Sequence, residues 1–192
     1  LSGQNLPLAR EAALFLSLAR PAAGEAWLDV GTSAGFYAGV LARVGAEVLA
    51  IDLSPAMLNE ARRREDAPNI HWGLLDVEDS GLPDGSFDGI TCGATLNELA
   101  DFACGLAETQ RLLKPGGKLW LMYVLRSGGE MQGLLERLGG TTFPERGEVA
   151  RALPDCDLAA AAVFGAVVFE LFVKRGGEAR RRAEDQESPS RL

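Results

Sequence analysis

Histidine and cysteine are scarce in this chain of 192 residues. It holds one histidine, His71, and three cysteines, Cys92, Cys104 and Cys156. An odd number of cysteines with this spacing matches neither a disulfide framework nor a structural zinc site, so we expect reduced, buried thiols. A single imidazole also excludes a metal site built from histidines, and we expect no metal centre.

Long apolar runs and an excess of basic charge are lacking too. No apolar run approaches the roughly 18 residues of a membrane span, and no basic segment precedes an apolar stretch as in a secretory signal. The net charge is −8, which repels the phosphates of nucleic acids. These properties predict a cytoplasmic protein with no membrane span and no nucleic-acid partner.

Helical and strand patterns alternate along the rest of the chain. Apolar spacing predicts helices over residues 6–19, 36–44, 55–64, 101–113, 130–138 and 145–153. Short apolar runs predict strands over residues 26–30, 47–51, 69–74, 87–92, 118–125, 158–163 and 167–173. This order indicates an α/β fold with a doubly wound, mainly parallel seven-stranded sheet whose last two strands form an antiparallel pair. Ligands of such sheets bind at the carboxyl ends of the strands.

The loop Asp29–Gly35, Asp-Val-Gly-Thr-Ser-Ala-Gly, is the most informative stretch. Its small residues let the backbone approach a ligand closely, although a tight structural turn also explains them. A dinucleotide-binding Gly-x-Gly-x-x-Gly fingerprint fails here because Ser33 and Phe36 occupy its second and third glycine positions. The loop therefore disfavours a nicotinamide-dependent oxidoreductase.

The same loop also spells Gly-x-Ser-x-Gly, the nucleophile elbow of serine hydrolases, with Ser33 as the nucleophile. The base would have to be His71, which starts the third predicted strand, whereas Ser33 follows the end of the first. The start and the end of parallel strands lie at opposite edges of the sheet, so the two side chains are not expected to meet. A serine hydrolase is therefore disfavoured.

A third interpretation fits best. The loop resembles the first motif of the class I S-adenosylmethionine-dependent methyltransferases, an acidic residue followed by x-Gly-x-Gly-x-Gly. Asp29, Gly31 and Gly35 match, and Ser33 replaces the middle glycine, which is tolerable if its backbone angles are ordinary. A carboxylate at position 29 can receive the ammonium group of the cofactor's methionine end, whereas it would repel a pyrophosphate.

The ends of the next two predicted strands each carry an aspartate. Asp52 follows Gly31 by 21 residues, and such an acid can accept hydrogen bonds from both ribose hydroxyls of a nucleoside. The alternative for Asp52 is a helix-capping or turn acid, and the alternative for Asp76 is a plain loop carboxylate. The resemblance implies that Leu53 packs on the adenine, that Asp76 accepts from its amino group and that the Val77 backbone contacts the ring edge.

Segments 49–58, 82–88 and 112–119 also resemble the family in their residues and in their order, so the resemblance covers about residues 27–124. We accordingly predict a methyltransferase domain over residues 1–175 and a charged, disordered or exposed tail over residues 176–192. The cofactor would be S-adenosylmethionine. The residues assigned to its site are Asp29, Gly31, Thr32, Ser33, Gly35, Asp52, Leu53, Met57, Asp76, Val77, Cys92 and Gly93.

The resemblance implies methyl transfer to a small molecule, with wording closest to the subgroup that methylates quinones and other lipophilic acceptors. In-line displacement on an activated methyl group requires mainly alignment and exclusion of water, so a catalytic signature is not expected. Asn97, Glu98 and Tyr123 are candidates for orienting or deprotonating the acceptor, with capping or packing as the alternative for each. A binding module without catalysis is the main alternative function. Neither the acceptor nor the oligomeric state can be inferred from these patterns.

Overall fold

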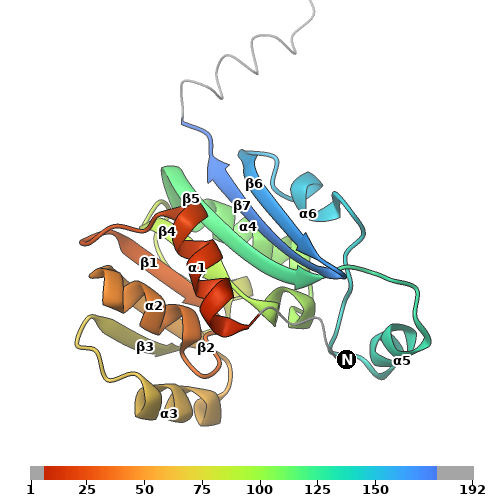
Figure 1. The fold of residues 1–192 in the computed structure, drawn as a ribbon, viewed down its shortest axis with the longest axis horizontal. Helices are drawn as coiled ribbons and strands as arrows, with labels where there is room; N and C mark the ends of the chain where they lie inside the picture. The colour runs from red at the N-terminus through yellow and green to blue at the C-terminus, as the bar shows by residue number, and fades with distance from the viewer. Residues whose placement is uncertain (1–6, 177–192) are drawn as a thin grey trace, which may run out of the picture.

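In the computed structural model, which describes residues 7–176, seven strands form one sheet in the order β3-β2-β1-β4-β5-β7-β6 (Figure 1). The first five strands in this order are parallel to one another, β7 runs antiparallel to β5, and β6 runs antiparallel to β7. The predicted fold is therefore confirmed. The strands are β1 (Ala26–Val30), β2 (Glu47–Asp52), β3 (Ile70–Leu74), β4 (Phe87–Cys92), β5 (Leu113–Val124), β6 (Cys156–Phe164) and β7 (Val167–Lys174).

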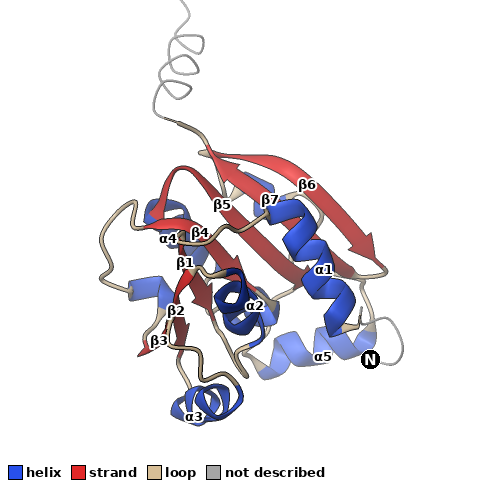
Figure 2. Cartoon of the chain, turned by 60° about the vertical axis from the view of Figure 1, so that its left-hand side comes forward, coloured by secondary structure: helices blue, strands red, loops and turns tan. Residues whose placement is uncertain are grey.

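Helices cover both faces of the sheet (Figure 2). Apolar residues of α1 and α2 share one buried cluster with Trp27 and Trp120, whereas those of α4 and α6 share another with Leu28 and Ile90. The helices are α1 (Leu8–Ala19), α2 (Phe36–Val44), α3 (Pro55–Arg64), α4 (Phe102–Leu112), α5 (Glu130–Leu138) and α6 (Glu148–Arg151), with short 3₁₀ turns η1 (Val77–Asp79) and η2 (Ala94–Glu98). None of the described helices is long and apolar enough to cross a membrane.

Side-chain caps set the start of two helices that follow strands. The Ser54 hydroxyl accepts a 3.3 Å hydrogen bond from the Met57 N–H, and Pro55 occupies the first turn of α3. Asp101 caps α4 through bonds of 3.0 and 3.1 Å from the N–H groups of Ala103 and Cys104. The α3 cap places the first turn of that helix directly after the end of β2.

A buried polar chain attaches α1 to the sheet. The Tyr37 hydroxyl donates to the Glu11 carboxylate at 2.6 Å and accepts from the Trp120 indole N–H at 2.9 Å. Burial raises the pKa of Glu11 and also that of Tyr37. Because Tyr37 lies in the first turn of α2, the chain joins α1, α2 and β5 next to the loop that follows β1.

Three expectations need correction. The predicted helix over 145–153 is helical only in Glu148–Arg151. Gly147, the residue before this helix, has a left-handed φ of +78°, which a right-handed helix through residue 147 would not allow. β5 starts before the Pro-Gly-Gly sequence, at Leu113, which pairs with Phe87 across a β-bulge. Of the three thiols only Cys92 is buried, whereas Cys104 is exposed. The predicted tail lies, apart from residue 176, outside the described residues.

Candidate functional site

A cavity of about 580 Å³ opens at the carboxyl ends of β1, β2, β3 and β4. This is the side on which the strand order reverses between β1 and β4, the usual ligand position in doubly wound sheets. Four loops, one after each strand, supply its walls. The lining residues are Val30, Gly31, Ser33, Ile51, Asp52, Leu53, Ser54, Met57, Leu75, Asp76, Val77, Glu78, Thr95, Glu98, Leu99 and Ala100.

Gly31 can only be glycine at its position. Its φ is +60°, and a Cβ atom built there would lie 2.0 Å from Oγ1 of Thr95. The same Oγ1 donates a 3.1 Å hydrogen bond to the Gly31 carbonyl, so the loops after β1 and β4 are in direct contact. Thr95 was not predicted as a site residue, because a lone threonine after a strand carries no signal of this contact.

The backbone of Ser33 is not ordinary, so the condition under which serine would be tolerated at this position is not met. Its φ is +49°, and Gly31 and Gly35 have φ values of +60° and +83°. All three glycine positions of the motif therefore adopt left-handed angles, and serine at the middle one is strained. The loop is held in this shape because the Ser33 N–H donates to Asp52 at 2.9 Å.

Asp29 lies inside the protein and does not line the cavity. Its carboxylate accepts hydrogen bonds from the hydroxyls of Thr32 at 2.6 Å and Thr91 at 2.7 Å and from the Ala38 N–H at 3.2 Å. Burial raises the pKa of Asp29 to about 6, while the two hydroxyl bonds oppose that rise. Through these bonds Asp29 holds the loop and the first turn of α2. Its contact with a ligand ammonium stays a prediction.

Thr32, Gly35, Cys92 and Gly93 also lie outside the cavity lining. Thr32 and Cys92 are buried, and burial raises the pKa of the Cys92 thiol to about 12. Gly35 forms the left-handed N-cap of α2. These four residues shape the loops behind the lining, and their direct contact with a cofactor stays a prediction.

Asp52, Leu53 and Met57 all line the cavity as the sequence predicts. Oδ2 of Asp52 accepts from the Ser33 N–H, and Oδ1 accepts from the Ser54 N–H at 2.8 Å. Each carboxylate oxygen has a second acceptor position, so hydroxyl groups of a ligand can still bind there. Leu53 is 67% exposed and offers an apolar surface to a flat ring.

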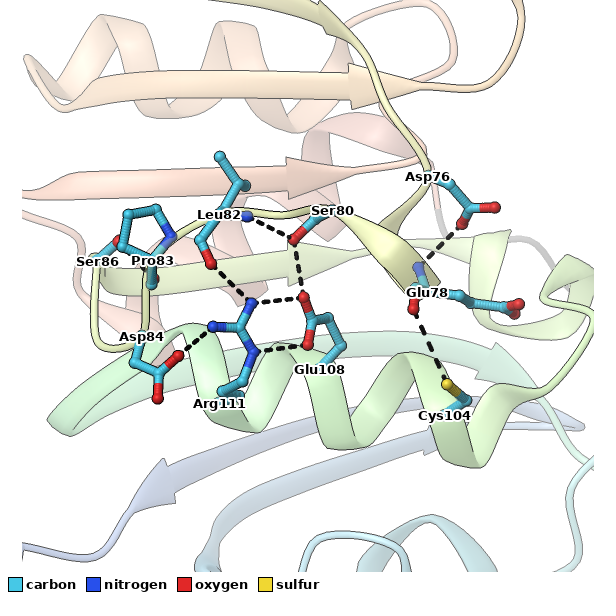
Figure 3. A network of polar contacts seen from close by, with 10 residues as sticks. All are labelled: Asp76, Glu78, Ser80, Leu82, Pro83, Asp84, Ser86, Cys104, Glu108 and Arg111. Carbon is cyan, nitrogen blue, oxygen red and sulfur yellow. Dashed lines mark hydrogen bonds and ion pairs between the residues drawn. The ribbon is translucent and has the colours of Figure 1, made fainter.

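Asp76 and Val77 line the next wall, after β3. Oδ1 of Asp76 accepts a 2.9 Å hydrogen bond from the Glu78 N–H, which starts the η1 turn (Figure 3). The Asp76 side chain is exposed, whereas that of Val77 is buried. The acid therefore faces the cavity from a fixed turn, and the Val77 side chain anchors that turn in the core.

Arg111 of α4 fixes the remainder of this loop (Figure 3). Its guanidinium donates to the Leu82 carbonyl at 2.7 Å, pairs with Asp84 and binds both oxygens of Glu108 at 2.6 and 2.7 Å. Glu108 in turn accepts a 2.8 Å bond from the Ser80 hydroxyl. This network connects the segment between Asp76 and β4 to the helix beneath it.

The three residues considered for orienting or deprotonating the acceptor differ in whether they line the cavity. Asn97 is buried, and its amide donates to the carbonyls of Val124 at 3.0 Å and Thr142 at 2.7 Å. Its Oδ1 accepts from the Val124 N–H at 2.8 Å, so all these interactions join the η2 turn to the segment that follows β5. Asn97 does not line the cavity, whereas Glu98 does and is exposed there.

Tyr123 is also buried and absent from the cavity lining. Its hydroxyl donates a 2.8 Å hydrogen bond to Glu170 of the neighbouring strand β7. Burial raises the pKa of Tyr123, with the Glu170 bond adding to the rise. This geometry gives Tyr123 a role in joining β5 to β7.

The charge of the cavity has one sign. Among the described residues that line it, four are acidic and none is lysine or arginine; the acids are Asp52, Asp76, Glu78 and Glu98. Such a lining favours a cation, such as a sulfonium or an ammonium group, and disfavours a pyrophosphate. The geometry is also poor for a hydrolase, because His71 pairs with Leu49 early in the β2–β3 ladder while Ser33 follows β1.

A doubly wound sheet of this order, with an acidic cavity at the strand ends, is typical of proteins that bind a nucleoside cofactor. Residues 28–121 match the family described as "Methyltransferase domain". Together with the relatives below, this match supports a class I S-adenosylmethionine-dependent methyltransferase that resembles the quinone methyltransferases.

Two curated relatives illustrate the similarity. The chain is 37% identical over 116 residues to "Ubiquinone biosynthesis O-methyltransferase" of Xanthomonas oryzae pv. oryzae (strain PXO99A), covering 59% of this chain and 48% of the relative. It is 43% identical over 98 residues to "Demethylmenaquinone methyltransferase" of Tropheryma whipplei (strain Twist), covering 50% and 41%. The chain thus spans about half the length of these relatives.

Solved structures share the fold at low sequence identity. The YcgJ protein of Bacillus subtilis aligns with a TM-score of 0.75 and 16% identity over 88% of this chain and 100% of that one. The structure titled "[4+2]-Cyclase SpnF" aligns with a TM-score of 0.75 and 16% identity over 88% and 81%. Because a protein named as a cyclase has the same fold, the fold alone does not define the reaction.

Proposed function

We propose that this chain binds S-adenosylmethionine in the cavity and transfers its methyl group to a small, lipophilic molecule in the cytoplasm. The observation that carries the proposal is the position of Asp52, Asp76 and the Gly31 loop around one acidic cavity at the strand ends. The similarity to a ubiquinone-biosynthesis methyltransferase and to a demethylmenaquinone methyltransferase supports a lipophilic acceptor.

The residues present fit the cofactor in shape and chemistry. Asp52 would accept the ribose hydroxyls, Leu53 would pack against the adenine, and Asp76 would accept from the adenine amino group. The close contact of Gly31 with Thr95 leaves the loop backbone, rather than a side chain, facing the cavity. The acidic lining would stabilise the cationic end of the molecule.

S-adenosylmethionine supplies a methyl group that is already activated by its positive sulfur. What the chain must add is alignment of the acceptor and exclusion of water. Of the three acceptor candidates, Glu98 alone lines the cavity, so we assign it the role of orienting the acceptor or removing its proton. Asn97 and Tyr123 are assigned to holding the neighbouring segments.

A methyl-transfer assay tests the proposal. The chain is incubated with S-adenosylmethionine labelled in the methyl group and with phenols and hydroquinones that carry apolar tails of increasing length. We expect label in an acceptor together with an equal amount of S-adenosylhomocysteine, and a faster reaction with longer tails. Cofactor binding without transfer to any member of the series would contradict the proposed reaction and favour the non-catalytic binding module.

A further inference from the structure

The outer strand β6 forms one edge of the sheet. Among residues 7–176 it pairs with β7 alone, and no strand lies on its other side in either view, although α6 lies beside it in Figure 1 (Figures 1 and 2). An edge strand directs alternate backbone N–H and C=O groups outward, where they can pair with another strand. With nine residues, β6 is longer than the opposite edge strand β3, which has five.

The composition of β6 leaves this edge unprotected. Residues 158–164 read Leu-Ala-Ala-Ala-Ala-Val-Phe, a run with no charged residue and no proline. Leu158, Val163 and Phe164 are 49%, 46% and 39% exposed. Soluble proteins usually guard an edge with lysine, proline or a bulge. β6 retains one such device, a bulge between Leu158 and Ala160, and the strand is regular from Ala160 onward.

We propose that β6 pairs antiparallel with β6 of a second copy of this chain, about a two-fold axis near Ala161. Such an axis sets Ala160 of each copy opposite Ala162 of the other, and the bulge before Ala160 then lies near Val163 and Phe164 of the second copy. Asp157, the nearest acidic residue before the run, lies beyond the bulge and outside the regular segment Ala160–Phe164. The pairing buries apolar side chains and brings no like charges face to face.

The distribution of charge makes this edge the part of the sheet where a second copy meets least repulsion. Each chain carries a net charge of −8, so two copies repel one another wherever acidic surfaces meet. The run 158–164 is free of charge, and antiparallel self-pairing there avoids that repulsion. A two-fold contact also closes after two copies, whereas a head-to-tail contact would continue into a filament.

The inference is independent of the proposed methyl transfer. The cavity lies at the ends of β1 to β4, and β5 and β7 separate those strands from β6 in the sheet. Pairing through β6 therefore leaves the cavity open in both copies. A variant that loses the pairing is expected to bind S-adenosylmethionine as the unchanged protein does.

Sedimentation of the full chain between about 2 and 200 μM tests the inference. We expect a reversible dimer that Ala161→Lys converts to a monomer, because two ammonium groups would then meet at the axis. Ala161 is exposed, so the folded chain should accommodate lysine, which circular dichroism checks. The matched control is Ala107→Lys, at an exposed position of α4, which should remain dimeric.

A cross-link tests the position of the axis. In a Cys104→Ser background, Ala161→Cys is expected to form a disulfide between two copies under mild oxidation, because facing residues of paired strands lie close together. A wild-type chain that stays monomeric at every concentration would overturn the proposal. So would a dimer that survives Ala161→Lys, or a chain that dimerises only after removal of residues 177–192, which would assign the edge to that segment.

Discussion

The main-chain N–H of Ser33 and the carboxylate of Asp52 form a hydrogen bond of 2.9 Å between the loop after β1 and the end of β2. The bond fixes the loop in its left-handed shape and orients the acid toward the cavity. Asp52 thus has two functions, one in the fold and one proposed in the site. Changes at either residue are expected to affect both the loop and the ligand.

Ser33→Gly should stabilise the protein or leave it unchanged. The left-handed backbone of residue 33 costs serine about 1 kcal/mol or more, and glycine removes that strain while losing some entropy on folding. We expect the free energy of unfolding in urea to rise by up to about 1 kcal/mol. Ser33→Val should lower it, because a β-branched residue tolerates positive φ worst. A loss of stability in the glycine variant would contradict the assigned strain.

Gly31→Ala should be far more damaging than Gly24→Ala. Both glycines have positive φ, +60° and +79°, so both variants carry backbone strain. Only at Gly31 would the new methyl group overlap Thr95, at 2.0 Å, whereas nothing lies within 4 Å of the corresponding point at Gly24. We expect an additional loss of at least about 1–3 kcal/mol for Gly31→Ala in thermal unfolding. Equal losses would show that the loops after β1 and β4 are not in close contact.

Asn97→Ala and Glu98→Gln should separate structure from chemistry. Removing the Asn97 side chain deletes two donated bonds and one accepted bond at partly buried backbone groups, and should lower stability by about 2–4 kcal/mol. Glu98 is exposed, so its variant should keep its stability to within about 0.5 kcal/mol. Its methyl transfer should fall by about 10²-fold if the carboxylate removes a proton from the acceptor. Unchanged turnover in Glu98→Gln would show that Glu98 does not remove the proton from the acceptor.

Asp29 predicts a specific pH dependence of stability. Its pKa is raised by burial from 3.8 to about 6 in the folded protein, so the protonated form is favoured by folding. The stability it contributes is complete below an unfolded pKa of about 3.9 and is lost as the pH rises through about 6. Asp29→Asn is neutral throughout and lacks this effect.

Between pH 4 and pH 7, the free energy of unfolding of the wild type should therefore fall relative to that of Asp29→Asn. The pKa change corresponds to a shift on the order of 3 kcal/mol. Glu11 and Glu170 also have raised pKa values, but both proteins contain them, and the difference removes their effect. Parallel pH profiles for the two proteins would contradict a buried, raised Asp29.

The sheet and most of the cavity wall could be predicted because they depend on local patterns. Apolar runs ending in aspartate marked β1 and β2, and parallel strands necessarily bring those ends to one edge. Asp52, Leu53, Met57, Asp76 and Val77 all line the cavity for this reason. The alternation of helices and strands determined which edge that would be.

What could not be predicted depends on contacts between distant segments. The sequence did not reveal that the Asp29 carboxylate accepts hydrogen bonds from Thr91 of β4, 62 residues away, and from the nearby Thr32. Nor did it reveal that the Asn97 amide donates a hydrogen bond to the carbonyl of Thr142, 45 residues away. The sequence also gave no indication that Thr95 packs against Gly31. Each of these contacts depends on how the loops pack together, which the spacing of residues in the sequence does not reveal.

The most direct measurement is calorimetric titration of the chain with S-adenosylmethionine, S-adenosylhomocysteine and NADH, on wild type and on Asp52→Asn. We expect the first two to bind at micromolar concentrations, NADH not to bind, and Asp52→Asn to lose at least about 1–3 kcal/mol of binding free energy. Circular dichroism of the variant confirms that the loop change has not unfolded it. Failure of both sulfur ligands to bind the folded wild-type chain, or tighter binding of NADH, would contradict the cofactor assignment.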